Sequence, residues 1–239
     1  MNFREYYGID APAVVRNLGL GGVILVIGGL LVGGTKSVRW LALNLTVAGV
    51  CMAATAVWML VSSLWLKQNV MRSLMNERQW HGDETVLDVG CGRGLVAIEA
   101  GKRVPRGSVH GIDLWQTVDL SGNSPDALLA NAQAGGVQKL LRIDTGDARS
   151  LPYADGMFDV VVSMTAIHNI PNVEGRQTAI AEIWRVTKPG GQIMVFDIFY
   201  SRSYLAQLRE LGASDMKLSG PILLWGLIGW RFSVRKPQD

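Results

Sequence analysis

Residues 86–94 of the chain read Val86-Leu87-Asp88-Val89-Gly90-Cys91-Gly92-Arg93-Gly94. The stretch begins as an apolar run of the kind that forms buried parallel strands, and three glycines follow at alternate positions. Glycines allow the backbone to bend sharply and to approach a ligand closely. Leu95 stands where the dinucleotide-binding pattern G-x-G-x-x-G has its third glycine, which disfavours a dinucleotide oxidoreductase. The stretch predicts a strand, a ligand-binding turn and a helix.

The same alternation of strand and helix continues to the C-terminal part of the chain. Further short apolar runs predict strands over residues 108–112, 141–144, 158–164 and 192–198. Helical patterns begin at Leu95 and cover residues 125–134 and 175–186. Strands that alternate with helices predict an α/β domain with a parallel sheet covered on both faces.

The composition shows a large apolar excess. Hydrophobic residues make up 49% of the 239 residues and charged residues only 18%, whereas soluble domains average about 25% charged. This composition excludes intrinsic disorder. The net charge of +3 is scattered along the chain, so the sequence predicts no nucleic-acid binding. The two cysteines, Cys51 and Cys91, exclude a disulfide scaffold and a cysteine-built zinc site, and we expect no metal.

Two uncharged stretches near the N-terminus account for the excess. Residues 17–35 and 40–66 carry no charge, and about 20 helical residues cross a bilayer. Tryptophans at both ends of the second stretch, Trp40 and Trp65, suit the two membrane interfaces. The short connection predicts an antiparallel transmembrane hairpin over residues 18–66. A secretory signal peptide is the alternative for the first stretch, but no small-residue cleavage site separates the two.

Small residues and flanking charges refine this prediction. Gly21-Gly22 and Gly28-Gly29 could pack closely against Gly49, Ala53 and Ala56, although glycine is common in membrane helices in any case. Five basic residues flank the hairpin and two lie in its loop, which favours both termini in the cytosol. The five are Arg4, Arg16, Lys67, Arg72 and Arg78, and the two are Lys36 and Arg39.

Three motifs follow the glycine loop in order. Asp113 ends the second predicted strand, Asp147-Ala148 follows the third, and residues 185–191 read Arg-Val-Thr-Lys-Pro-Gly-Gly. A carboxylate at the end of the second strand can accept both hydroxyls of a ribose. Together with residues 86–94, this set resembles the class I S-adenosylmethionine-dependent methyltransferases, in particular the branch of quinone and small-molecule methylases. The resemblance covers about residues 70–237.

The resemblance implies a Rossmann-like, doubly wound, mostly parallel seven-stranded sheet and S-adenosyl-L-methionine as cofactor. It implies that Asp88, Gly90 and Gly92 border the methionine part, that Asp113 holds the ribose, and that Asp147 with the Ala148 amide reads the adenine edge. Cys91 is expected to pack. The remaining expected cofactor-site residues are neighbours of these motifs, namely Gly94, Leu114 and Thr165.

His168 follows the fourth predicted strand, and the carboxyl ends of strands face the ligand crevice in doubly wound sheets. It is therefore the candidate general base, if the acceptor needs one, because an imidazole titrates near neutral pH. The alternative is that His168 caps the strand or packs beside the cofactor. His81 and His110 are assigned no role.

Two segments stay open at this stage. The resemblance implies a closing antiparallel hairpin over residues 215–219 and 230–236, with an apolar stretch, 220–229, between its strands. That stretch either packs under the membrane helices, dips into the interface or folds over the core. The aromatic N-terminal segment, residues 1–17, could fold over the cleft as a lid, although tails of this length are more often loose.

These observations predict a three-part chain: residues 1–17, the transmembrane hairpin 18–66, and the methyltransferase domain 67–239. The leading hypothesis is an integral membrane enzyme with its catalytic domain on the cytosolic face, which methylates a small lipophilic acceptor. The alternatives are an anchored enzyme for a soluble acceptor and a non-catalytic nucleotide-binding membrane adaptor. The acceptor atom and the oligomeric state are left open.

Overall fold

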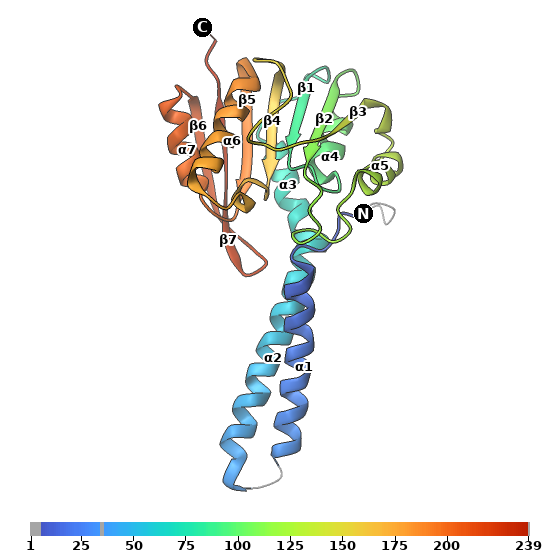
Figure 1. Ribbon diagram of the computed structural model, residues 1–239, viewed down its shortest axis with the longest axis vertical. Helices are drawn as coiled ribbons and strands as arrows, with labels where there is room; N and C mark the ends of the chain where they lie inside the picture. Colours follow the sequence, from blue (N-terminus) through green and yellow to red (C-terminus); the bar gives the residue numbers. More distant parts are fainter. Residues whose placement is uncertain (1–5, 34–35, 239) are drawn as a thin grey trace.

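The computed structural model describes residues 6–33 and 36–238, and it consists of an α/β domain from which a long helical hairpin projects (Figure 1). The strands are β1 Thr85–Val89, β2 Ser108–Asp113, β3 Leu141–Thr145, β4 Phe158–Met164, β5 Thr187–Asp197, β6 Ser214–Leu224 and β7 Leu227–Arg235. The helices are α1 Pro12–Val32, α2 Arg39–Val61, α3 Lys67–Met75, α4 Leu95–Arg103, α5 Pro125–Ala134, α6 Val173–Val186 and α7 Ser201–Glu210. Short helical turns are η1 Lys36–Val38, η2 Ser62–Leu66, η3 Gln138–Leu140 and η4 Ile167–Asn169.

The strands form one seven-stranded sheet in the order β3-β2-β1-β4-β5-β7-β6. The first five pair in parallel, and β7 pairs antiparallel with both β5 and β6. The strand order reverses between β1 and β4, where doubly wound sheets bind their ligands. The predicted mostly parallel, Rossmann-like sheet is confirmed.

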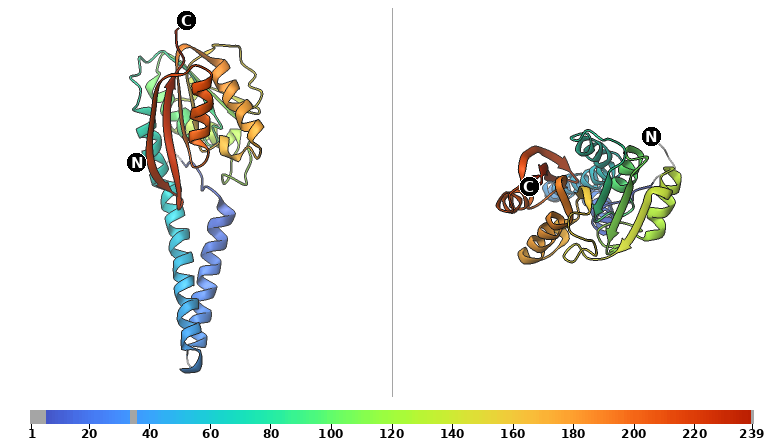
Figure 2. Two further views of the ribbon diagram at one scale, coloured as in Figure 1. Left: turned by 90° about the vertical axis from the view of Figure 1, so that its left-hand side faces the viewer. Right: turned by 90° about the horizontal axis from the view of Figure 1, so that it is seen from above.

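Alternate residues of the strands fill two cores, because successive side chains of a strand point to opposite faces. On one face Leu87 and Val161 pack with α6 and α7, and on the other Val86 and Val160 pack with α3 and α4. The two layers of helices lie on opposite sides of the sheet in Figure 2.

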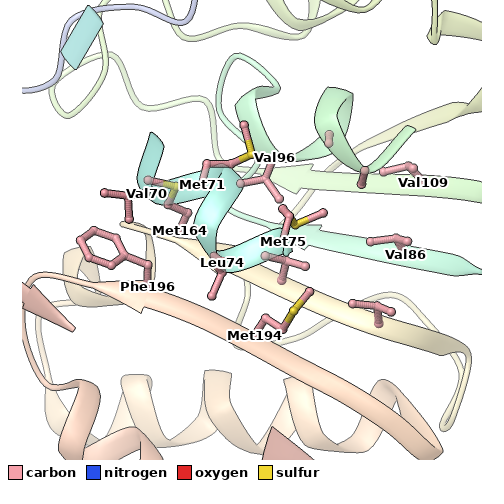
Figure 3. Packing of buried hydrophobic residues seen from close by; sticks show 14 of the residues in the cluster. Val70, Met71, Leu74, Met75, Val86, Val96, Val109, Met164, Met194 and Phe196 are labelled. Carbon is pink, nitrogen blue, oxygen red and sulfur yellow. The ribbon is translucent and has the colours of Figure 1, made fainter. Parts of the chain in front are cut away.

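The helix α3 is the continuation of the long hairpin helix α2 across the π-helical turn η2. Leu74 and Met75 of α3 are fully buried among Val86 and Met194 of the sheet (Figure 3). The hairpin is therefore fixed to the domain, because α2 continues into α3, whose residues are part of the core of the domain.

Glycines bring α1 and α2 close together. A Cβ atom on Gly22 would lie 2.8 Å from the carbonyl oxygen of Gly49, and one on Gly29 would lie 2.8 Å from that of Ala42. Gly28 has no atom of another residue within 4 Å of its Cβ position, so it faces away from α2. Close packing thus uses only one glycine of the pair Gly28-Gly29. Both helices are long and apolar enough to cross a membrane by length and composition.

The boundaries differ from the prediction at two places. The first long helix begins at Pro12, six residues before the expected start at residue 18. The stretch 220–229 is not an insertion, because it forms the ends of β6 and β7 and a tight turn between them. Leu224 and Trp225 pack against the hairpin helices, whereas Leu223 and Ile228 are exposed. The period-2 alternation of the strands places neighbours on opposite faces.

Candidate functional site

The carboxyl edge of the parallel strands faces the helical hairpin. Asp197 at the end of β5 pairs with Trp230, near the turn of the β6–β7 hairpin. At that turn the backbone N–H of Trp225 donates to Ser62 Oγ at 3.1 Å, and its indole N–H donates to Ser63 Oγ at 3.0 Å. The carboxyl ends of the parallel strands, where doubly wound sheets bind ligands, therefore lie beside the domain-side ends of α1 and α2 (Figure 1).

The glycine loop forms one wall of a large cavity at this edge. Gly90 has a φ of 75° and Gly92 a φ of 50°, a conformation that favours glycine. A Cβ on Gly90 would lie 2.1 Å from that of Ala166 across the cavity wall. The backbone N–H groups of Gly90 and Cys91 both donate to the carbonyl of Ile112, which fixes the turn on β2.

Most of the expected cofactor residues line this first cavity. They are Asp88, Gly90, Cys91, Gly92, Asp113, Leu114, Asp147, Ala148 and Thr165. Gly94 is outside the lining, at the start of α4, where a Cβ would lie about 3 Å from Leu128 and Ile98. Its role is close packing of the helix. Burial raises the pKa of the Cys91 thiol, which supports the expectation that this residue packs.

Asp88 lies on β1 and is fully buried at the cavity wall. Its Oδ2 accepts a hydrogen bond from the Ala97 N–H at 2.9 Å, while its Oδ1 has no partner among the described residues. Burial raises the pKa of Asp88 to about 8, and the carboxylate of Asp113 adds to the rise. An unpaired buried carboxyl oxygen is costly, so this atom points to a polar or cationic ligand.

Asp113 ends β2 and is held by the loop residues around it. Its Oδ2 accepts from the Gly92 N–H at 2.8 Å, and its Oδ1 accepts from the Trp115 N–H at 2.6 Å and from Asn123 at 3.2 Å. Each carboxylate oxygen can accept more than one hydrogen bond. The carboxylate is therefore held rigidly at the position expected for a ribose partner.

Asp147 is engaged by a residue that sequence reasoning missed. The guanidinium of Arg149 donates to Oδ1 at 3.0 Å and to Oδ2 at 2.5 Å, and this pairing lowers the pKa of Asp147. Both residues line the cavity. The Arg149 side chain therefore lies beside Asp147, where the resemblance implies that the adenine edge of the cofactor binds.

The N-terminal segment closes the cavity from the hairpin side. Tyr7 is buried against Cys91 and Leu128, and Asp10 forms an isolated antiparallel bridge with Leu120. Tyr7 and Asp10 line the first cavity. Residues 1–5 of the expected lid lie outside the described residues. The lid stays a prediction, and Tyr7 and Asp10 are the described residues of this segment that lie at the cavity.

Lys67 at the start of α3 holds this segment. Its ammonium donates to the carbonyls of Tyr7 and Gly8 and pairs with Asp10 at 3.0 Å, while its side chain is only 5% exposed. The sequence suggested only a flanking positive charge here, because nothing local signals that the N-terminal segment returns to it. The position of α1 is thereby linked to the first cavity.

A second cavity adjoins the first one. It is lined by Asp10, Ala11, Met59, Asp119, Thr165, His168, Asn169, Ile198, Trp225 and Leu227. His168 lines this cavity and not the first. Burial raises the pKa of Asp119, which lines both.

His168 is held by a partner that sequence reasoning missed. Its Nδ1 lies 2.5 Å from Asp197 Oδ1, and its backbone N–H donates to Asp197 Oδ2 at 3.1 Å. Asp197 ends β5, so the rule that strand ends face the ligand could have identified it. His81 lies at the protein surface, and His110 is buried against Tyr153 and Phe158. Within residues 6–33 and 36–238, no group of three His, Cys, Asp or Glu side chains could hold a metal.

Known methyltransferases are similar in sequence to part of this chain. Residues 87–195 match the family model described as a methyltransferase domain. The chain is 34% identical over 138 residues to a demethylmenaquinone methyltransferase of Deinococcus radiodurans, an alignment that covers 57% of this chain and 52% of that protein. It is 32% identical over 114 residues to a ubiquinone/menaquinone biosynthesis C-methyltransferase of Dinoroseobacter shibae, with 48% and 42% covered.

A solved structure shares the fold. The geranyl diphosphate C-methyltransferase of Streptomyces coelicolor, in complex with S-adenosyl-L-homocysteine, superposes with a TM-score of 0.58 at 14% identity, covering 74% of this chain and 82% of that one. The chain spans about half the length of the curated relatives named above. Residues 87–195 are thus similar to a methyltransferase domain.

Proposed function

We propose that this protein is an S-adenosylmethionine-dependent methyltransferase, that α1 and α2 anchor it in a membrane, and that it methylates a small lipophilic acceptor. The observation that carries the proposal is the rigid connection between hairpin and site. The helix α2 continues into the core helix α3, and the ligand-binding edge of the sheet faces the hairpin. A catalytic domain held in this way has its cleft at the bilayer surface.

The outer surface of the hairpin supports the anchor. Large apolar side chains such as Ile24, Leu31 and Leu43 are more than half exposed along α1 and α2. Apolar surface of this extent is unfavourable in water, at about 25 cal/mol per Å². The hairpin therefore suits hydrocarbon, and the cytosol is the side we propose for the domain.

The residues of the first cavity, which we call the cofactor cavity from here on, fit the proposed cofactor. Asp88 offers an unpaired carboxyl oxygen, Gly90 and Gly92 place the backbone of the loop at the cavity wall, and Asp113 presents a fixed carboxylate. When bound, S-adenosylmethionine supplies a methyl group on a sulfonium. We propose that Asp88, Gly90 and Gly92 hold its methionine part, that Asp113 holds the ribose and that Ala148 with Asp147 borders the adenine.

The chain's own residues then exclude water and position the acceptor. The N-terminal segment held by Lys67 covers the cofactor cavity, and the second cavity lies beside it. The relatives named above act on demethylmenaquinone or in ubiquinone and menaquinone biosynthesis, according to their names. A lipophilic ring compound is therefore the first acceptor class to test.

The test has two stages with purified full-length protein in detergent or nanodiscs. Calorimetric titration with S-adenosylmethionine should show binding, and Asp113→Ala should weaken it at least tenfold, because each hydrogen bond to a charged group contributes about 1.5–3 kcal/mol. Asp126→Ala, which removes an exposed acid from α5, is the control and should leave the affinity unchanged. Unchanged affinity in Asp113→Ala would contradict the cofactor assignment.

The second stage offers labelled S-adenosylmethionine together with a lipid extract or a water-soluble extract. Methyl transfer to a compound of the lipid extract is the expected outcome. Transfer only to a soluble compound would favour an enzyme for which the hairpin is a simple anchor. Tight cofactor binding without transfer to either extract would favour the non-catalytic adaptor.

A further inference from the structure

We propose that the second cavity is the acceptor site, that it takes an amphipathic acceptor with an ionisable hydroxyl group, and that His168 removes the hydroxyl proton. This inference rests on the proposed function, because it assigns the acceptor side of the same reaction. It concerns residues that meet at the junction of hairpin and domain.

The second cavity is continuous with the cofactor cavity. Asp10, Asp119, Thr165 and Asn169 line both. Thr165 stands between them with a φ of 54°, a strained conformation for a β-branched residue, and its backbone N–H donates to the carbonyl of Phe196. A ligand in the second cavity therefore lies next to the cofactor, and methyl transfer requires that proximity.

The second cavity is lined by both apolar and polar side chains. The apolar ones are Met59, Ile198, Trp225 and Leu227, and the polar ones are Asp10, Asp119, Thr165, His168 and Asn169, all of which except His168 also line the cofactor cavity. A ligand with a polar head and an apolar body matches this lining. The head would then lie beside the cofactor and the apolar body beside the hairpin.

The depth of the cavity in the proposed membrane supports the same class of ligand. Ala11 immediately precedes α1, and Met59 lies in the last turn of α2. The 21 residues of α1 span about 30 Å, the thickness of the hydrocarbon layer. One end of both helices, and with it the cavity, therefore lies at the interface between hydrocarbon and headgroups, where an amphipathic molecule resides.

His168 is arranged to accept a proton from this ligand. Asp197 is 1% exposed and holds Nδ1, so the imidazole presents Nε2 for the acceptor. In the step, the acceptor O–H bond breaks, its proton bonds to Nε2, and the electron pair stays on oxygen. The acceptor then forms its bond to the methyl carbon while the carbon–sulfur bond of the donor breaks. The sulfur is then neutral, and the positive charge is on the imidazolium.

Three acids belong to the surroundings of His168. Asp197 is in contact with the ring, and Asp119 and Asp10 line the same cavity. Asp10 is paired with Lys67, whereas Asp197 is placed to form an ion pair with the imidazolium once His168 has taken the proton.

The test uses 2-octyl-4-nitrophenol, a coloured phenol with an apolar tail, and protein in nanodiscs saturated with S-adenosyl-L-homocysteine. Absorbance reports the phenolate, and empty nanodiscs provide the blank. Wild type should lower the apparent pKa of the bound probe. His168→Asn should raise that pKa by about one unit relative to wild type, a tenfold change in the ionisation constant. Asp197→Asn should act in the same direction, since it removes the charge that fixes the ring.

A matched pair of tryptophan variants locates the probe. Met59→Trp fills the cavity and should abolish probe binding, whereas Val57→Trp, on the same helix but 59% exposed, should not. Equal probe binding in the two variants would overturn the assignment of the cavity. An unchanged probe pKa in His168→Asn would overturn the role of His168. Calorimetry with S-adenosyl-L-homocysteine checks that each variant is folded, and absence of that binding in wild type would instead contradict the proposed function.

Discussion

Asp88 is the residue whose chemistry depends most on what binds beside it. Because burial raises its pKa to about 8, the carboxyl group is mostly protonated at pH 7 in the free protein. A cationic ligand beside it favours the carboxylate. We expect S-adenosylmethionine binding at pH 7 to release a proton and to become tighter as the pH rises toward 8. Calorimetry in two buffers of different ionisation enthalpy measures this release, and Asp88→Asn should abolish it.

The same shift has a consequence for the stability of the free protein. The unfolded chain loses the Asp88 proton near pH 3.9, whereas the folded chain keeps it to about pH 8. The folded state thus binds more protons between these values, so the contribution of Asp88 to stability falls as the pH rises through this window. Asp88→Asn should flatten that part of the profile. An unaltered profile in this variant would show that the group is ionised throughout.

At the scale of elements, the α1–α2 contact depends on which glycines face the partner helix. Gly22→Val would place side-chain atoms against the backbone of Gly49 and Ala53, and such overpacking costs about 1–3 kcal/mol. Gly28→Val meets no neighbouring atom within 4 Å of its Cβ and serves as the control. Thermal unfolding in one detergent should show a lower Tm for the first variant only. Equal melting of the two would contradict the close contact.

The β6–β7 hairpin has one buried and one exposed set of apolar side chains. Trp225 is 8% exposed and bonded to Ser62 and Ser63, so Trp225→Ser should destabilise the protein by about 3–5 kcal/mol and lower cofactor binding with it. Leu223→Ser with Ile228→Ser should leave the Tm unchanged and slow methylation of a membrane-embedded acceptor. Full stability of Trp225→Ser in a denaturation assay would show that the contacts of Trp225 with Ser62 and Ser63 do not stabilise the protein.

The sequence predicted these elements unequally. The strands β1 to β4 were predicted to within one residue at each end, because buried parallel strands are continuous apolar runs between clear turns, whereas β5 begins at Thr187, five residues before the expected start. Residues 220–229 were misplaced because an apolar strand end and an apolar loop look alike, and only the register of β6 on β7 separates them. The glycine loop and Asp113 could be located because local motifs mark them. The contacts of Arg149 with Asp147 and of Asp197 with His168 arise from side-chain geometry and loop folding that no local motif signals.

At the scale of the whole molecule, the connection between the α1–α2 hairpin and the α/β domain was the least predictable feature. The burial of Leu74 and Met75 requires that α2 continue across η2 onto the sheet, and the bond of Lys67 to Tyr7 requires that the chain return from α1 to the same place. Both depend on contacts between distant segments. The hairpin, the N-terminal segment and the second cavity are thus parts of one arrangement, and a change in the tilt of α1 would alter the cover of the cofactor cavity.

This arrangement makes the orientation in the membrane a test of the whole proposal. The domain and residues 6–11 lie at the same end of the hairpin, and the loop at Ser37 lies at the other end (Figure 1). Five basic residues flank the domain-side end against two in the loop, which favours the cytosol for the domain.

With Cys51 replaced by alanine, a cysteine at the exposed position Ser37 should react with an impermeant thiol reagent added to intact cells, and one at the exposed position Gln238 should react only after lysis. Cys91 is buried and remains as an internal control. Labelling of Gln238→Cys in intact cells would place the cleft outside the cytosol, away from the cofactor supply, and a membrane-anchored methyltransferase could not then work in the proposed way.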